Sequence, residues 1–104
     1  MHMQFVEFEL QGIGLAEYEA LVEELAPAFA DIPGLIAKVW IADPESNRAG
    51  GIYTWADSES CDAYLESDLF QAALANPALA NLRSRRFGVL EGPTAITGGP
   101  AIRI

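Results

Sequence analysis

Apolar residues alternate with other residues in four segments of the chain, which is the spacing of β-strands that bury one face. The predicted strands are residues 3–11, 35–42, 50–56 and 82–90. On the first strand, one face carries Gln4, Val6, Phe8 and Leu10, and the opposite face carries Phe5, Glu7 and Glu9.

The second and third strands are predicted to form a β-hairpin around the polar loop of residues 43–48. The second strand has two apolar faces, one with Leu35, Ala37, Val39 and Ile41 and the other with Ile36, Lys38, Trp40 and Ala42. Both of these faces are therefore expected to be covered. The third strand places Gly51, Tyr53 and Trp55 on one face and Ile52, Thr54 and Ala56 on the other. The adjacent glycines Gly50 and Gly51 allow a bulge or a close backbone approach.

Two longer segments change to an apolar spacing of three and four residues, which is typical of amphipathic helices. The apolar stripe of the first helix consists of Leu15, Tyr18, Val22, Leu25 and Phe29, widened by Leu21. Pro27 is expected to kink or end this helix near Leu25, and Ile32-Pro33-Gly34 is a clear stop signal.

The second helical segment begins after Asp57, whose carboxylate suits the N-cap position. Its buried stripe is predicted to contain Cys61, Tyr64, Leu65, Leu69 and Phe70. Ser67 and Asp68 can interrupt the segment and cap a second helical piece, which Asn76-Pro77 ends.

The resulting order of elements is β-α-β-β-α-β, so the sequence predicts an α+β, ferredoxin-like sandwich with helices on one face of an antiparallel sheet. Residues 1–93 are expected to form this domain, and residues 94–104 to form a C-terminal arm that can lie on a neighbouring subunit.

The sheet face without helices is expected to be too apolar to remain in water, because it would carry Phe5 and one aromatic-bearing face of the hairpin. Two copies packed sheet to sheet would cover it, so we expect a homodimer, a dimeric α/β barrel, with an enclosed hollow beside the hairpin. The sequence leaves open which sheet face lines that cavity.

Composition narrows the possible partners. The chain has 104 residues, enough for one domain, and its net charge of −9 argues against a nucleic-acid-binding surface. Four glutamates on the first helix, at positions 17, 19, 23 and 24, are expected to form a solvated face.

With one cysteine and one histidine, neither a disulfide framework nor a metal site is predicted. No signal peptide or membrane-length apolar run is present, so we expect a cytoplasmic protein without a membrane partner.

The hairpin and the helix after it carry a family resemblance. The segments are Pro33-Gly34, Lys38-Val39-Trp40, Ala49-Gly50-Gly51-Ile52-Tyr53 and Ala63-Tyr64-Leu65. They resemble the YdhR-type monooxygenase family of the dimeric α/β-barrel superfamily, and the likeness runs from the first strand to about Phe87. The resemblance implies relatedness to small oxygenases of antibiotic biosynthesis, which oxidise polycyclic phenols without metal or flavin. The glycine-rich stretch Thr97-Gly98-Gly99-Pro100 matches no motif of that family.

Candidate site residues are those that could surround a flat aromatic ligand and stabilise negative charge on it. The candidate catalytic residues are Tyr53, Trp40 and Lys38, and the candidate substrate-binding residues are Trp55, Tyr64 and Arg86. The alternative for each aromatic residue is ordinary packing.

The basic candidates have alternatives of their own. For Lys38, an exposed strand edge or an ion pair is favoured over a functional cavity with a shifted pKa. For the arginines at positions 83, 85 and 86, we favour two interpretations over anion binding: a charged edge strand, or ion pairs with the acidic first helix. Arg83 and Arg85 share one face of their strand, and Arg86 lies on the other.

The residues themselves predict only a possible pocket, and the family resemblance implies the reaction: a cofactor-independent monooxygenase that uses O₂ on a small aromatic or polycyclic compound. A non-catalytic binding module for a small molecule, and an isomerase or decarboxylase on the same fold, are the alternatives.

Overall fold

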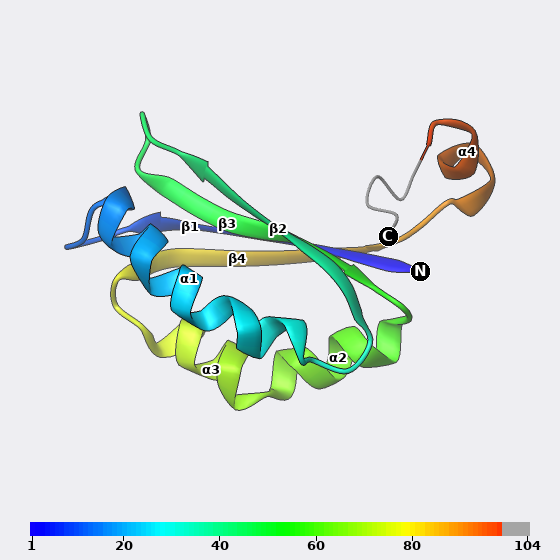
Figure 1. Cartoon of the computed structure of the whole chain (residues 1–104), viewed down its shortest axis with the longest axis horizontal. Helices are drawn as coiled ribbons and strands as arrows, with labels where there is room; N and C mark the ends of the chain where they lie inside the picture. Colours follow the sequence, from blue (N-terminus) through cyan, green and yellow to red (C-terminus); the bar gives the residue numbers. More distant parts are fainter. Residues whose placement is uncertain (99–104) are drawn as a thin grey trace.

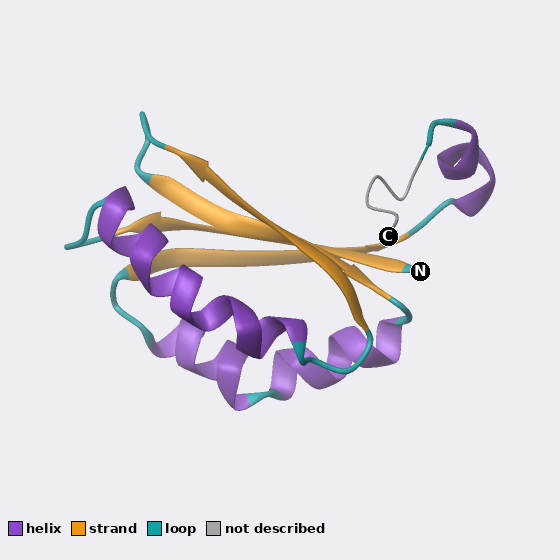
Figure 2. Cartoon of the chain, in the orientation of Figure 1, coloured by secondary structure: helices purple, strands orange, loops and turns teal. Residues whose placement is uncertain are grey.

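The computed structural model describes residues 1–98 and contains a four-stranded antiparallel sheet with helices packed on one face (Figures 1 and 2). The strands are β1 (His2–Leu10), β2 (Leu35–Asp43), β3 (Arg48–Trp55) and β4 (Leu79–Gly88). The helices are α1 (Leu15–Ala30), α2 (Ser58–Glu66), α3 (Asp68–Ala75) and α4 (Glu91–Ile96). The strand order β2-β3-β1-β4 leaves β2 and β4 at the edges. This arrangement confirms the predicted ferredoxin-like α+β fold.

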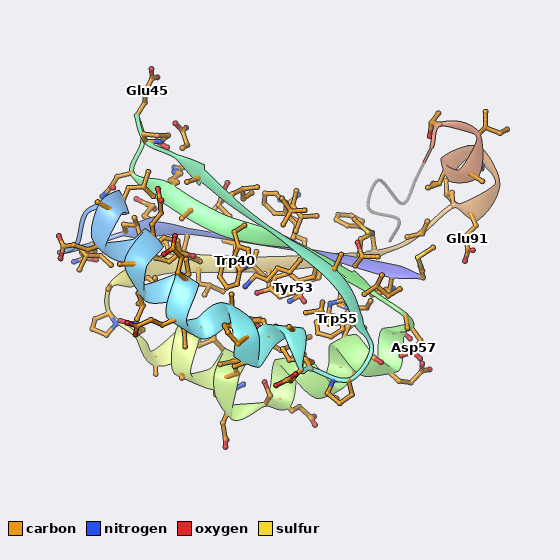
Figure 3. All side chains as sticks on the ribbon, in the orientation of Figure 1. Trp40, Glu45, Tyr53, Trp55, Asp57 and Glu91 are labelled. Carbon is orange, nitrogen blue, oxygen red and sulfur yellow. The ribbon has the colours of Figure 1, made fainter. Side chains whose placement is uncertain are left out.

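The helix-covered face of the sheet forms the core together with α1, α2 and α3. On β1, the predicted inner face is confirmed, because Val6, Phe8 and Leu10 are buried and Gln4 is 1% exposed. On β3, Tyr53 and Trp55 are buried on this same inner face (Figure 3). The glycines of β3 permit the expected close backbone approach.

The aromatic face of the hairpin differs from the expectation that it lies on the uncovered side of the sheet. Trp40, Tyr53 and Trp55 point toward the helices (Figure 3). The alternation of a strand defines two faces, but only the packing of distant helices decides which face they cover. The uncovered face instead carries residues such as Phe5, Ile52 and Val39.

The faces of β2 also depart from strict alternation near its start. Leu35 pairs with Trp55, but Ala37 pairs with Thr54, so the register shifts at Ile36. This bulge turns Leu35 to the inner face and leaves Ile36 46% exposed. With Val39 41% exposed as well, the single chain does not cover both faces of this strand.

Helix α1 continues through Pro27 to Ala30, so the predicted end near Leu25 is wrong. Proline removes one backbone hydrogen bond at a cost of about 3 kcal/mol. The last turn also carries Phe29, which is 8% exposed and packs on Trp40 with ring centroids 5.1 Å apart. We attribute the continuation of the helix to this burial, which offsets the local cost.

The outer face of α1 is solvated as expected, since its glutamates at positions 17, 19, 23 and 24 are exposed. At 16 residues, α1 is the longest helix described. In residues 1–98, no helix combines the length and the apolar character that a membrane crossing requires.

The caps of the next two helices are confirmed. The Asp57 carboxylate accepts a hydrogen bond from the Ser60 backbone N–H at 2.8 Å and begins α2. The Ser67 hydroxyl accepts one from the Phe70 N–H at 3.3 Å and begins α3, which ends before Asn76.

The last strand begins earlier and ends sooner than predicted. Asn81 has a φ of 54°, and its side chain donates to Glu9 where the β1–β4 register shifts. This irregularity hides the strand character of residues 79–81 in the sequence. The chain then forms α4, a short helix that the sequence pattern did not predict and that lies away from the helix layer (Figure 1). The predicted boundary at residue 93 falls inside α4, and residues 99–104 of the expected arm lie outside the described residues.

Candidate functional site

A cavity of about 180 Å³ lies between the inner face of the sheet and helices α1, α2 and α3. Most of its lining is apolar, with contributions from all four strands. The lining residues with aromatic or ionisable side chains are Phe8, Tyr18, Phe29, Lys38, Trp40, Tyr53, Tyr64 and Phe70. The cavity belongs to a single chain and lies on the helix side of the sheet. It is therefore not the hollow between two sheets that the sequence led us to expect.

Lys38 reaches this cavity because of its position on β2. The residue pairs with Tyr53 of β3, so its side chain starts on the inner face. A Cβ atom at Gly51 would lie 2.7 Å from the Lys38 Cε, so the glycine leaves the room in which the lysine side chain crosses β3. The expected strand-edge or ion-pair role of Lys38 is wrong, because the side chain turns inward and the ion pairs of residues 1–98 do not include it.

The Lys38 Nζ is surrounded by the faces of three aromatic rings. It lies 3.3 Å from the ring centroid of Trp40, 3.6 Å from that of Phe29 and 4.6 Å from that of Tyr53. Burial lowers the pKa of Lys38 from 10.5 to about 7. The ring faces attract the ammonium form by about 0.5–2 kcal/mol. The lowered pKa corresponds to about 5 kcal/mol, so the cost of burying the charge is the larger effect.

Two phenol groups of the cavity lining meet each other. The hydroxyls of Tyr53 and Tyr64 are 3.1 Å apart and share one hydrogen bond. Burial raises the pKa of both, and the proximity of Tyr64 adds to the effect on Tyr53. Both phenols therefore stay protonated at neutral pH. Because one O–H is used between them, the O–H of the accepting partner is left to donate to a bound molecule.

Helix α1 supplies two aromatic residues that the sequence placed on a helix stripe but not in the site. Phe29 covers Lys38, and Tyr18 lines the cavity with a pKa that burial raises to about 12. The 3.6-residue period shows that both residues face the core, but it does not show which strand residues they meet. One further signal in the sequence points to the site: Lys38 is the single lysine of the chain.

Trp55 and Arg86 lie outside the cavity lining. Trp55 is completely buried, stacks on Tyr53 with centroids 5.9 Å apart, and donates its Nε1–H to Gln4 Oε1 at 3.0 Å. It therefore supports the cavity wall from behind.

Arg86 is occupied at the other end of α2. Its Nε–H donates to His2 Nε2 at 3.0 Å, and its terminal nitrogens donate to the Asp62 carboxylate and to the Ser58 carbonyl. Thus Arg86 pairs with α2 rather than with the acidic face of α1. Arg83 and Arg85 are exposed on the other face of β4, which is an edge strand.

Cys61 is completely buried, as its place on an apolar stripe predicted, and burial raises the pKa of its thiol. Among residues 1–98, no three His, Cys, Asp or Glu side chains gather in a way that could hold a metal ion. The ionisable groups in contact with the cavity are thus one amine and three phenols.

Comparison with solved structures gives the same fold in several proteins. A protein of unknown function from Nitrosomonas europaea superposes with a TM-score of 0.72 at 20% identity, covering 88% of this chain and 90% of that one. A "putative antibiotic biosynthesis monooxygenase" from Deinococcus radiodurans gives 0.72 at 16% identity, with coverage of 88% and 95%. SnoaB, a cofactor-independent oxygenase from Streptomyces nogalater, gives 0.67 at 25% identity, with coverage of 86% and 94%.

Sequence comparison assigns the family directly. No curated protein gives a significant match. The family model described as "Putative mono-oxygenase ydhR" matches residues 3–100, nearly the whole chain. The predicted resemblance is confirmed, and the chain belongs to the ydhR mono-oxygenase family.

Proposed function

We propose that this protein is a cofactor-independent monooxygenase that oxidises a small aromatic compound in the cavity beside Lys38. The observation that carries the proposal is an amine with a pKa of about 7 that contacts three aromatic rings in a cavity also lined by a pair of protonated tyrosines. The family match and the likeness to SnoaB support the reaction type.

In this reaction the substrate ring would pack against Trp40 and the other aromatic walls. The neutral Lys38 amine would accept a proton from the weakly acidic O–H or C–H of the substrate. The resulting electron-rich anion reduces O₂, and the hydroxyl left over from the Tyr53–Tyr64 pair donates to the oxygen on which charge develops. The overall change is SH₂ + O₂ → SO + H₂O, so one oxygen atom enters the substrate S and the other leaves as water.

The size of the cavity favours a substrate with one ring over a polycyclic one. A dry cavity of about 150 Å³ in another protein accepts benzene. The cavity described here, at about 180 Å³, is only slightly larger.

Oxygen consumption tests the proposal. The full-length protein would be mixed with a panel of single-ring phenols and with anthrone, with and without a metal chelator. We expect chelator-insensitive O₂ uptake with a single-ring phenol, and slower uptake for Lys38→Met and Tyr53→Phe. A Glu24→Gln variant on the exposed face of α1 serves as the matched control. Tight binding of the phenols without any O₂ uptake would instead identify a binding module.

The six sequence candidates have different roles in this proposal. Lys38 and Tyr53 act on the substrate, and Trp40 and Tyr64 shape its pocket. Trp55 holds Tyr53 in place by stacking. Arg86 anchors α2 to β4 through Asp62 and is not expected to touch the substrate.

We also propose that two copies pair through the sheet face that has no helices. Phe87 is 57% exposed and Val39 41% exposed, and both lie on that face. Burial of such side chains stabilises association by about 25 cal/mol per Å² of apolar surface. Sedimentation at micromolar concentration is expected to show a dimer, and Val39→Glu, at the exposed position, is expected to weaken it. A wild-type monomer would contradict this assembly.

A further inference from the structure

The single lysine of the chain is half-buried and lines the cavity. The contacts of its Nζ within residues 1–98 are ring faces, and neither a carboxylate nor a hydrogen-bond acceptor holds it there. This arrangement leaves the nitrogen lone pair free whenever the amine is neutral.

We propose that Lys38 is a nucleophile that captures small, uncharged aldehydes or ketones in the cavity as an imine. The reaction differs from the oxygenation proposed above and consumes no O₂, although both would use the same amine.

The chemistry balances without a further reactant. The Lys38 Nζ attacks the carbonyl carbon and forms a carbon–nitrogen bond, while the carbonyl oxygen takes up a proton. The carbinolamine then loses its hydroxyl as water, and the nitrogen gives up its second hydrogen to leave R₂C=N–Lys38. No electrons are transferred to or from an outside group, and one water leaves for each imine formed.

Three features of the cavity favour these steps. Burial keeps roughly half of the Lys38 side chains in the neutral form at pH 7, whereas an ordinary lysine with a pKa of 10.5 has about one in 3,000 neutral. The apolar walls disfavour water, which is the product of the dehydration. The Tyr53–Tyr64 pair keeps one phenol O–H that can donate a hydrogen bond to the departing hydroxyl, which leaves as water with the second nitrogen hydrogen.

The lining also defines the class of carbonyl compound. The groups facing Lys38 are Phe29 from α1, Trp40 from β2 and Tyr53 from β3, so within residues 1–98 the cavity lining has no charged group besides Lys38 itself to pair with a charged ligand. The volume of about 180 Å³ admits a single ring. The site is therefore suited to compounds of the size and polarity of benzaldehyde.

Gly51 is a positioning residue in this proposal. An added Cβ would lie 2.7 Å from the Lys38 Cε but 3.3 Å from the nearest atom of Tyr53. The flexible lysine would therefore move more than the tyrosine in Gly51→Ala. This variant keeps the amine but displaces it from its ring contacts. It therefore tests whether the position of the amine matters, whereas Lys38→Met tests whether the amine is needed at all.

Reductive trapping tests the proposal. The full-length protein would be incubated anaerobically at pH 7 with benzaldehyde and sodium cyanoborohydride, and the product analysed by intact mass and peptide mapping. We expect saturable benzylation of Lys38, at least about tenfold faster than in the protein unfolded in urea at the same pH. Gly51→Ala should slow trapping at Lys38, with an unchanged circular dichroism spectrum. Lys38→Met should leave only the background at the Met1 amine.

A matched ligand control uses anthracene-9-carbaldehyde, which is too large for the cavity and should not label Lys38 faster in the folded protein than in the unfolded one. Equal rates at Lys38 for folded and unfolded protein with benzaldehyde, or labelling confined to Met1, would overturn the proposal. Because imine formation consumes no O₂, either result would overturn the imine proposal alone. The oxygen-uptake experiment would still decide the monooxygenase proposal.

Discussion

Replacing Lys38 with methionine should change how the stability of this protein depends on pH. The pKa of Lys38 is about 7 in the folded protein and 10.5 for the ordinary side chain. Between these values the folded protein binds fewer protons than the unfolded chain. The stability of the wild type therefore rises with pH across this window, and below pH 7 the full cost of burying the lysine remains.

The size of the effect follows from the linkage relation. For one group with these two pKa values, the free energy of unfolding increases by about 2 kcal/mol from pH 7 to pH 9. Lys38→Met removes the titrating group and keeps an unbranched side chain of similar length. We expect the variant to be more stable than the wild type at pH 7, and the difference to shrink by about 2 kcal/mol at pH 9.

Urea denaturation followed by tryptophan fluorescence measures this difference, because Trp55 is completely buried and Trp40 is partly buried in the folded protein. Other groups titrate in both proteins, including the buried Cys61 thiol, whose raised pKa lowers stability as pH increases. Their contributions cancel in the comparison. A constant gap between the two proteins from pH 7 to pH 9 would refute the reasoning. It would mean that the aromatic rings keep Lys38 as an ammonium ion.

Three further substitutions test the packing around the site by the same urea assay. Trp55→Phe leaves Gln4 Oε1 without its 3.0 Å donor and should cost about 1–3 kcal/mol; a loss well below 1 kcal/mol would contradict the role of that bond. Gly50→Ala would place a Cβ 1.9 Å from the Val6 carbonyl oxygen, so we expect the free energy of unfolding to fall by more than about 3 kcal/mol, or the variant not to fold. Near-normal stability would contradict this and show that β1 and β3 can separate. Ser67→Ala removes the cap of α3 and should cost about 1 kcal/mol, with Ser67→Asp retaining most of the stability if capping is the cause.

Local signals were sufficient to predict most of the fold. Turn residues and caps such as Asp57 and Ser67 act within a few residues of their own positions, so their effects can be read from the sequence. The alternation on β3 was correct for the same reason. Pro27 and Ile36 were misjudged because the last turn of α1 and the bulge in β2 depend on packing against distant residues.

Four of the six candidate site residues lie together in the structure. One cavity is lined by Lys38, Trp40, Tyr53 and Tyr64, and such proximity is required if these residues act on the same ligand. Their spacing could not show that helices cover the aromatic face, nor that Phe29 would complete the enclosure of the amine. Trp55 and Arg86 have the chemical character of ligand-binding residues, but each is engaged with other parts of the protein. Which partner a side chain meets depends on the tertiary fold.

The placement of the only lysine has a practical consequence for studies of self-association. Reagents that join surface amines would find only the amino group of Met1 on the outside of each subunit, and that group forms an ion pair with Glu91. Amine crosslinking would therefore be a poor test of the proposed dimer, whereas the fifteen Asp and Glu side chains can be joined by an added dihydrazide linker after carbodiimide activation.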